Sequence, residues 1–271
     1  MPLPFPKNQV RKLGQRLRAQ DLPSDDDLAM LEELLAAYDE ALNVVVSAIR
    51  DSLAIAPSQR LKNTGTIIEK LRRSSATHLA NIQDLAGARI VLDGGHPADQ
   101  DRLVSDLAGL FEHHGWDHHV IDRRLTPMQG YRAVHIVGRV DELPVEVQIR
   151  TAWQHQWAES FEKIADRLGR SIRYSSEVDV EDVLASLRVP ATVPDEIRAV
   201  TSAFTKAIVE SALTYSSVIA EAEAALIDDI EAEQVEAIAT RCIADMRHMV
   251  ELLDAFATGP AIDAFRQERG L

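Results

Sequence analysis

The chain has 271 residues, of which 46% are hydrophobic, and its formal net charge at pH 7 is -14. These values predict a folded protein of one large or two modest domains and exclude a disordered chain. Cys242 is the only cysteine, which excludes an intramolecular disulfide and a cysteine-based zinc cluster. We find no apolar run long enough to span a membrane and no apolar signal core, so we expect no membrane contact and a cytoplasmic location.

The acidic charge is distributed unevenly. The part from Ser176 onward is strongly acidic, whereas the part before it is close to neutral and contains two basic clusters. One cluster lies in residues 7–18, and the other is "RLKNTGTIIEKLRR" at Arg60–Arg73. A local basic patch in an acidic protein favours a discrete polyanion, such as a nucleotide triphosphate, over a long duplex.

The amino-terminal part of the chain has helical patterns. Residues 8–20 predict a short basic helix. The helix that follows has Ser24 as a plausible N-cap, acids in its first turn and apolar residues at helical spacing. A third helix is predicted at about Thr64–Arg73.

The next part alternates between strand and helix patterns. Ala88–Leu92 is a short β-branched run typical of a buried strand, and the helical pattern after it closes at Gly115. Three more strand candidates follow, in "DHHVIDRR", "YRAVHIVGRV" and "PVEVQIR". This mixture predicts an α/β (α+β) core, with a mixed β-sheet flanked by helices.

After Tyr174 the pattern changes to two long helices, the first starting near Pro194 and the second ending near Gly259. We therefore expect three parts: an amino-terminal helical segment at 1–56, a core at 57–175 and a carboxyl-terminal helical extension at 176–271. The extension could be a homo-oligomer interface, a site for a neutralising protein partner, or a cover for the core.

Two carboxylates of the predicted core, Asp84 and Glu146, lie among basic and polar residues. On "VEVQIR", the residues Glu146, Gln148 and Arg150 alternate with apolar residues and therefore share one face of a strand. Mg²⁺ usually takes one or two carboxylates plus substrate phosphates, and nearby bases offset the charge that develops in phosphoryl transfer. The other polar candidates are Arg60, Lys62, Thr66, Lys70, Arg89, Tyr131, Arg132, His135 and His155.

Each pattern also has a plainer interpretation when it is taken alone. The polar strand face and the basic run could be solvated surfaces, and Tyr131 could be an aromatic residue at the edge of the core. "HHGWDHH" at His113–His119 suggests a metal site, but a helix end and turn rarely present four ligands. Trp153 and Trp157, four residues apart on a predicted helix, indicate core packing.

Taken in order, five motifs resemble the synthetase domain of the RelA/SpoT family, the alarmone synthetases that make (p)ppGpp. "RLKNTGTIIEKL" is similar to the ATP-holding segment, "DLAGARI" to the Asp-x-Ala-Gly-x-Arg motif, and "GYRAVH" to the acceptor motif. "VEVQIRT" is similar to the motif of the catalytic glutamate, and "QHQWAE" to the helix that follows it. The resemblance covers about residues 55–175 and implies a nucleotidyltransferase-like sheet flanked by helices.

The resemblance also implies roles for individual residues. Asp84 and Glu146 would be catalytic and hold Mg²⁺, and Glu146 would activate the acceptor hydroxyl. Tyr131 would stack on the guanine. The ATP-binding residues would be Arg60, Lys62, Thr66, Lys70 and Arg89; the acceptor-binding residues would be Tyr131, Arg132, His135, Gln148, Arg150 and His155.

The implied reaction moves the β,γ-pyrophosphate of ATP to the 3′-hydroxyl of GDP or GTP, without the family's hydrolase domain. The turn "LTPMQG" departs from the family pattern because it is one residue shorter and lacks the usual lysine. This favours an alternative, toxin-like reaction in which the acceptor is the 3′ end of tRNA. The basic protein segment at residues 7–18 could then hold the acceptor stem of the tRNA through phosphate contacts. The same helix could instead pack on the fold. A third hypothesis is a catalytically deficient relative that only binds nucleotide or a partner.

Overall fold

The computed structural model describes residues 3–19, 22–73, 76–174, 179–186, 195–227 and 232–258. The chain forms two compact units. The first, which we call the sheet unit, comprises Met1–Val91, Gln100–Ile121 and Val134–Ile149. The second, the helical unit, comprises Leu92–Asp99, Asp122–Ala133 and Arg150–Leu271. The expected three-part division stays a prediction, and its boundary at 175/176 lies outside the described residues.

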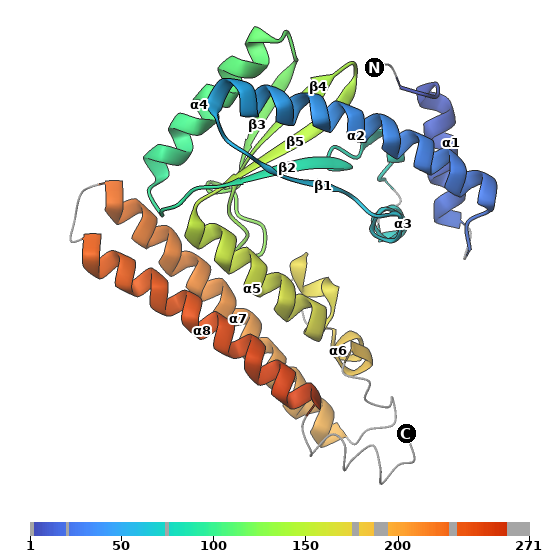
Figure 1. Cartoon of the computed structure of the whole chain (residues 1–271). Helices are drawn as coiled ribbons and strands as arrows, with labels where there is room; N and C mark the ends of the chain where they lie inside the picture. The colour runs from blue at the N-terminus through green and yellow to red at the C-terminus, as the bar shows by residue number, and fades with distance from the viewer. Residues whose placement is uncertain are drawn as a thin grey trace. The chain divides into compact units, whose positions relative to one another are not determined.

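Among the described residues, five strands form one sheet in the order β1-β2-β5-β4-β3 (Figure 1). Their bounds are β1 Ser58–Leu61, β2 Ala86–Val91, β3 His118–Asp122, β4 Val134–Val140 and β5 Leu143–Arg150. β1 pairs antiparallel with β2, and β4 pairs antiparallel with β5. His135 lies opposite Gln148, and Val137 lies opposite Glu146. Because directly paired residues share a face, His135, Gln148 and Glu146 project from the same side of the sheet.

The helices of this part are α1 Lys7–Ala19, α2 Asp25–Leu53, α3 Thr64–Arg73, η1 Leu79–Asn81 and α4 Pro97–His113. Ser24 Oγ accepts a hydrogen bond from the Asp27 N–H at 3.2 Å, which confirms the predicted N-cap of α2. α2 packs on β1 and β2, and α1 packs on α2, α3 and η1. α1 buries Val10, Leu13 and Leu17, so the basic helix packs on the fold through its apolar face.

The helical unit contains α5 Ala152–Leu168, η2 Arg170–Arg173, α6 Val180–Ser186, α7 Asp195–Ile227 and α8 Ala232–Thr258. α7 packs along α8, and α5 packs on both of them. Pro194 and Gly259, at the predicted ends of the long helices, lie outside the described residues. In the described part of the chain we find no helix long and apolar enough to cross a membrane.

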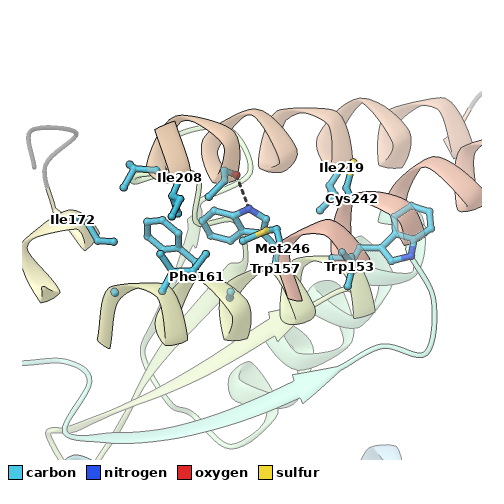
Figure 2. Close-up of a cluster of buried hydrophobic side chains, with 14 of the residues drawn as sticks. Trp153, Trp157, Phe161, Ile172, Ile208, Ile219, Cys242 and Met246 are labelled. Atoms are coloured by element: carbon cyan, nitrogen blue, oxygen red, sulfur yellow. Dashed lines mark hydrogen bonds between the residues drawn. The ribbon is translucent and has the colours of Figure 1, made fainter. Parts of the chain in front are cut away.

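A hydrophobic cluster joins the three long helices of this unit. Trp153, Trp157 and Phe161 of α5 meet Ile208 and Ile219 of α7 and Met246 of α8 in its core (Figure 2). The Trp157 ring stacks on Phe161 with centroids 4.9 Å apart, and its Nε1–H donates to the Ala212 carbonyl at 2.8 Å. The predicted core packing of both tryptophans is confirmed.

Candidate active site

Asp84 lies in the loop between η1 and β2 and is held between two lysines of the basic cluster at Arg60–Arg73. Lys62 Nζ lies 2.5 Å from Oδ2, and Lys70 Nζ of α3 lies 2.8 Å from Oδ1. Burial acts to raise the pKa of Asp84, but the charges and hydrogen bonds of the two lysines outweigh it and hold that pKa below its ordinary value. Burial in turn lowers the pKa of Lys62, although Asp84 acts in the opposite direction. The carboxylate of Asp84 is therefore ionised at neutral pH.

Glu146 is the second carboxylate of this site. We call the group of Asp84, Glu146, Lys62 and Lys70 the Asp84–Glu146 cluster. Its side chain lies on β5, where the residue is 8% exposed. Oε1 lies 2.8 Å from His135 Nδ1, and Oε2 accepts from Gln148 Nε2 at 2.8 Å. Burial acts to raise the pKa of Glu146, but His135 and Gln148 outweigh it and lower that pKa. The charge of Asp84 also reaches Glu146 and acts to raise its pKa, so the two carboxylates sense each other.

The β4–β5 hairpin positions Glu146. Val145, Val147 and Ile149 are 0% exposed, so the apolar side of β5 is fixed in the core. A two-residue turn joins the strands, with positive φ at Asp141 (47°) and Glu142 (73°), as type I′ hairpin turns require. A slip of one residue would place the valines on the polar face, so the core fixes the position of Glu146 in the register.

Three further residues predicted to bind ATP lie on β1, β2 and α3. Arg60 lies opposite Gly87, and Arg89 lies opposite Ser58, so both arginines share one face of the β1–β2 pair. The N–H and hydroxyl of Thr66 both donate to Asn63 Oδ1 at 2.8 Å. Asn63 therefore caps α3. This cap was not predicted, although an Asn directly before a helix is a known capping signal.

The donor set of the cluster fits Mg²⁺. The described residues contain no group of three or more His, Cys, Asp or Glu that could hold a metal ion, but Asp84 and Glu146 supply two ionised carboxylates. Mg²⁺ is usually bound by one or two carboxylates together with substrate phosphates. In "HHGWDHH", His114 stacks on Trp116 with centroids 4.5 Å apart, and the rings of His118 and Phe111 form a T-shaped pair with centroids 5.8 Å apart.

The turn that departs from the family pattern lies in the helical unit. Tyr131 N–H donates to the Met128 carbonyl at 3.0 Å, and φ is 49° at Gln129 and 77° at Gly130, which defines a type I′ turn. A Cβ on Gly130 would lie 2.7 Å from Trp157 Cζ2. The Gly130 carbonyl accepts from Ser216 Oγ at 2.5 Å. This turn is therefore fixed by α5 and α7 and requires glycine.

The helical unit also contains four residues predicted to bind the acceptor. Arg150 Nη2 donates to the Tyr131 hydroxyl at 2.9 Å, and its guanidinium carbon lies over the ring, 4.9 Å from the centroid. Tyr131 is partly buried and packs on the hydrophobic cluster. Arg132 Nη1 donates to the Arg124 carbonyl at 2.7 Å, and His155 Nε2 lies 3.5 Å from Glu159. The structure thus brings Tyr131 and Arg150 into direct contact.

Glu223 of α7 is a buried carboxylate that the sequence analysis missed. Thr151 Oγ1 donates to its Oε1 at 2.5 Å, and Gln154 Nε2 donates to its Oε2 at 3.0 Å. Thr151 and Gln154 also form the capping box of α5. Burial raises the pKa of Glu223, although both hydrogen bonds and the charges of Arg132 and Arg124 act to lower it. The T-x-x-Q capping box was the only signal in the sequence, and it does not reveal a partner 72 residues away.

Comparison with known proteins identifies the family. Residues 59–165 match the family model described as the region found in RelA / SpoT proteins. Two mycobacterial relatives, the uncharacterized proteins Rv1366 of Mycobacterium tuberculosis (strain H37Rv) and Mb1401 of Mycobacterium bovis, are each 36% identical over 196 residues. Those matches cover 71% of this chain and 69% of each relative. The chain belongs to the RelA/SpoT family.

Solved structures that are similar to this chain include the small alarmone synthetase 1 from Bacillus subtilis. It has a TM-score of 0.47 and 19% identity, with 74% of this chain and 97% of that chain covered. Structures of that protein bound to its product pppGpp and to AMPCPP are also similar to this chain. A GTP pyrophosphokinase family protein from Streptococcus pneumoniae has a TM-score of 0.44 and 21% identity, with 78% and 97% covered.

Proposed function

We propose that this protein transfers the β,γ-pyrophosphate of ATP to the 3′-hydroxyl of GDP or GTP. The observation that carries the proposal is the cluster of two ionised carboxylates, Asp84 and Glu146, with Lys62 and Lys70. Membership of the RelA/SpoT family supports the reaction class. The roles predicted for Arg60, Thr66 and Arg89 toward ATP, and for Tyr131, Arg132, His135, Gln148, Arg150 and His155 toward the acceptor, are part of this proposal.

In this mechanism the lysines exchange partners. Lys62 and Lys70 hold Asp84 in the free protein and would turn to the phosphates of ATP, where their charge offsets the charge of the transferred group. Asp84 and Glu146 would hold Mg²⁺, which supplies further neutralisation of the phosphate oxygens. Both lysines are partly buried, with 15% and 29% of their side chains exposed.

Glu146 would orient and deprotonate the acceptor. His135 and Gln148 keep its carboxylate ionised and fix both oxygens, so one oxygen can accept a hydrogen bond from the 3′-hydroxyl. The hydroxyl oxygen then forms a bond to the β-phosphorus of ATP, and the bond from that phosphorus to the α,β-bridging oxygen breaks. The hydroxyl proton passes to Glu146, and AMP leaves.

A second acceptor, the 3′ end of tRNA, is favoured by one observation. The segment "LTPMQG" at residues 125–130 carries no lysine, and its last residue, Gly130, is held by Trp157 and Ser216. A tRNA terminus has no free 5′-phosphates for such a lysine to bind. The alternative stays a proposal beside the guanosine nucleotides.

The test is a thin-layer assay with γ-³²P-labelled ATP and Mg²⁺, in which GDP, GTP and deacylated tRNA are offered in parallel. Label on GDP or GTP with release of one AMP per product supports the proposal, and label on tRNA selects the alternative acceptor. A 3′-deoxy-GTP control should accept no label. Nucleotide binding with no transfer to any acceptor would instead support the catalytically deficient relative.

A further inference from the structure

A cavity of about 460 Å³ lies in the sheet unit, apart from the Asp84–Glu146 cluster. Its wall is formed by the start of α1, by α2, by residues around η1 and by the β4–β5 turn; the residues are Leu3, Lys7, Asn8, Val10, Arg11, Tyr38, His78, Ala80, Asn81, Arg139 and Glu142. None of these residues belongs to the proposed transfer site. The volume falls in the range of about 300–1,000 Å³ that is typical of sites for small organic ligands.

The rim of the cavity is cationic. Lys7, Arg11 and Arg139 carry positive charge, and Glu142 is the only carboxylate among the described residues that line it. Glu142 is paired with Lys7 at 2.9 Å. The lining therefore keeps a net positive charge although the chain as a whole is at -14, and such a local field attracts anions.

The start of α1 adds to this field. α1 begins at Lys7, has no acid in its first turn, and places Lys7 and Asn8 in the wall of the cavity. The N–H groups of Gln9 and Val10 donate to the Pro6 carbonyl at 2.8 and 3.2 Å, and the helix dipole makes this end favourable for anions. α1 has 13 residues, which is long enough for a developed dipole at its start.

Tyr38 is the most buried polar residue of the wall. The residue is 2% exposed, and within the described ranges of the chain its hydroxyl makes no hydrogen bond. Buried tyrosine hydroxyls usually have a partner. Burial raises the pKa of Tyr38 to about 12, although Arg139 acts in the opposite direction, so the hydroxyl is a protonated donor at neutral pH. An anionic oxygen in the cavity would accept this bond.

We propose that this cavity is a second anion site, which binds a phosphorylated small molecule of nucleotide size. Arg11 and Arg139 contact its phosphates from the rim, and the Tyr38 hydroxyl donates to a phosphate oxygen from below. Asn8 Oδ1 accepts from Arg11 Nη2 at 3.3 Å and so helps to hold that guanidinium, and the amide of Asn81 is available to the uncharged part of the ligand. This site goes beyond the proposed pyrophosphate transfer, because its ligand takes no part in that reaction.

The test is a calorimetric titration of the full chain with ADP in the presence of EDTA, repeated with inorganic pyrophosphate and with uncharged guanosine. Tyr38→Phe removes only the hydroxyl and should weaken ADP binding at the cavity about tenfold, which is the loss of one hydrogen bond to a charged group. Arg11→Ala combined with Arg139→Ala should abolish that binding. Lys12→Ala, on the same helix and exposed but outside the cavity, should leave it unchanged. Guanosine should not bind.

The same titrations in a Lys62→Ala background separate the cavity from the transfer site. ADP binding that survives Lys62→Ala and is lost with Arg11→Ala and Arg139→Ala supports the cavity site. The proposal is overturned if ADP and pyrophosphate binding disappears with Lys62→Ala alone, or if Tyr38→Phe and the double arginine variant bind like the wild type. Either result leaves the proposed transfer reaction standing, because that reaction is judged by label transfer.

Discussion

Two buried glutamates, one in each unit, have similar surroundings and opposite pKa shifts. Glu146 is 8% exposed and accepts hydrogen bonds from His135 and Gln148, and Glu223 is 4% exposed and accepts from Thr151 and Gln154. Burial acts to raise the pKa of both carboxyl groups. It is outweighed at Glu146, whose pKa is lowered, and it prevails at Glu223, whose pKa is raised.

The difference lies in the partners. Glu146 contacts an imidazole that can carry positive charge, whereas the two side chains that contact Glu223 are neutral. A charged contact favours the ionised form, whereas the two neutral donors and the charges of Arg132 and Arg124 together do not outweigh burial at Glu223. Burial and hydrogen bonding alone therefore do not identify a catalytic carboxylate. We infer that Glu146 serves chemistry and that Glu223 joins α7 to the start of α5.

The largest expected effect concerns the other carboxylate of the sheet unit. Asp84→Asn removes the charge that holds Lys62 and Lys70 and should reduce the rate of pyrophosphate transfer by about 10²- to 10³-fold. Asp106→Asn, an exposed carboxylate on α4, is the matched control and should transfer at the wild-type rate. Full activity of Asp84→Asn would remove Asp84 from the site.

The next largest effect is on stability, and it tests whether contacts with the rest of the helical unit restrict the turn at Met128–Tyr131. Gly130→Ala introduces a Cβ 2.7 Å from Trp157 Cζ2 at φ 77° and should lower the free energy of unfolding by about 2–4 kcal/mol, from backbone strain plus overpacking. Gly115→Ala has a similar φ of 69° and open space around the Cβ, so it should cost only the strain, about 1–2 kcal/mol. Equal losses in urea unfolding would show that Trp157 does not restrict the turn.

The imidazole partner of Glu146 can be removed directly. His135→Phe deletes the hydrogen bond and the charge that hold the pKa of Glu146 down, so that pKa should rise. Glu146 is ionised only above its pKa, so the transfer rate falls when the pH drops below that value. In the variant this fall should begin at a higher pH than in the wild type. His119→Phe, on the exposed surface of β3, should leave the acid limb of the pH–rate profile where it is in the wild type.

The smallest expected effect is a difference in how stability depends on pH. The pKa of Glu223 is raised in the folded protein. Its contribution to the free energy of unfolding is therefore fully present below the ordinary carboxyl pKa and is lost as pH rises through the pKa of the folded protein. The stability of Glu223→Gln relative to the wild type should thus improve as pH rises. Glu146→Gln should show the opposite slope, because the contribution of Glu146 is present above the ordinary value and lost as pH falls. Urea unfolding at several pH values measures both slopes, and slopes of the same sign would refute the comparison.

Much of the fold could be predicted because its signals are local. The cap at Ser24, the helical spacing of α2 and the alternation of β5 each act over a few residues, and the structure has these elements where they were expected. β1 was missed because Ser58–Leu61 has no apolar alternation: three of its four residues are exposed, and its pairing with β2 defines it.

The candidate site was predictable only where residues are close in sequence. The shared face of Glu146 and Gln148 follows from their spacing of two on a strand. The pairing of Asp84 with Lys62 joins residues 22 positions apart, and that of Thr151 with Glu223 joins residues 72 apart, so both depend on tertiary packing. No periodic pattern encodes such contacts, and the structure was needed to find them.

The most direct measurement compares the two glutamates in one label-transfer assay. Glu146→Gln and Glu223→Gln make the same substitution of a carboxyl group at two buried sites, and both variants are measured with γ-³²P-labelled ATP, the accepting nucleotide and Mg²⁺. We predict that Glu146→Gln loses about 10²- to 10³-fold in rate while Glu223→Gln stays near the wild-type rate. Equal losses in the two variants, or full activity of Glu146→Gln, would contradict the assignment of the chemistry to the Asp84–Glu146 cluster.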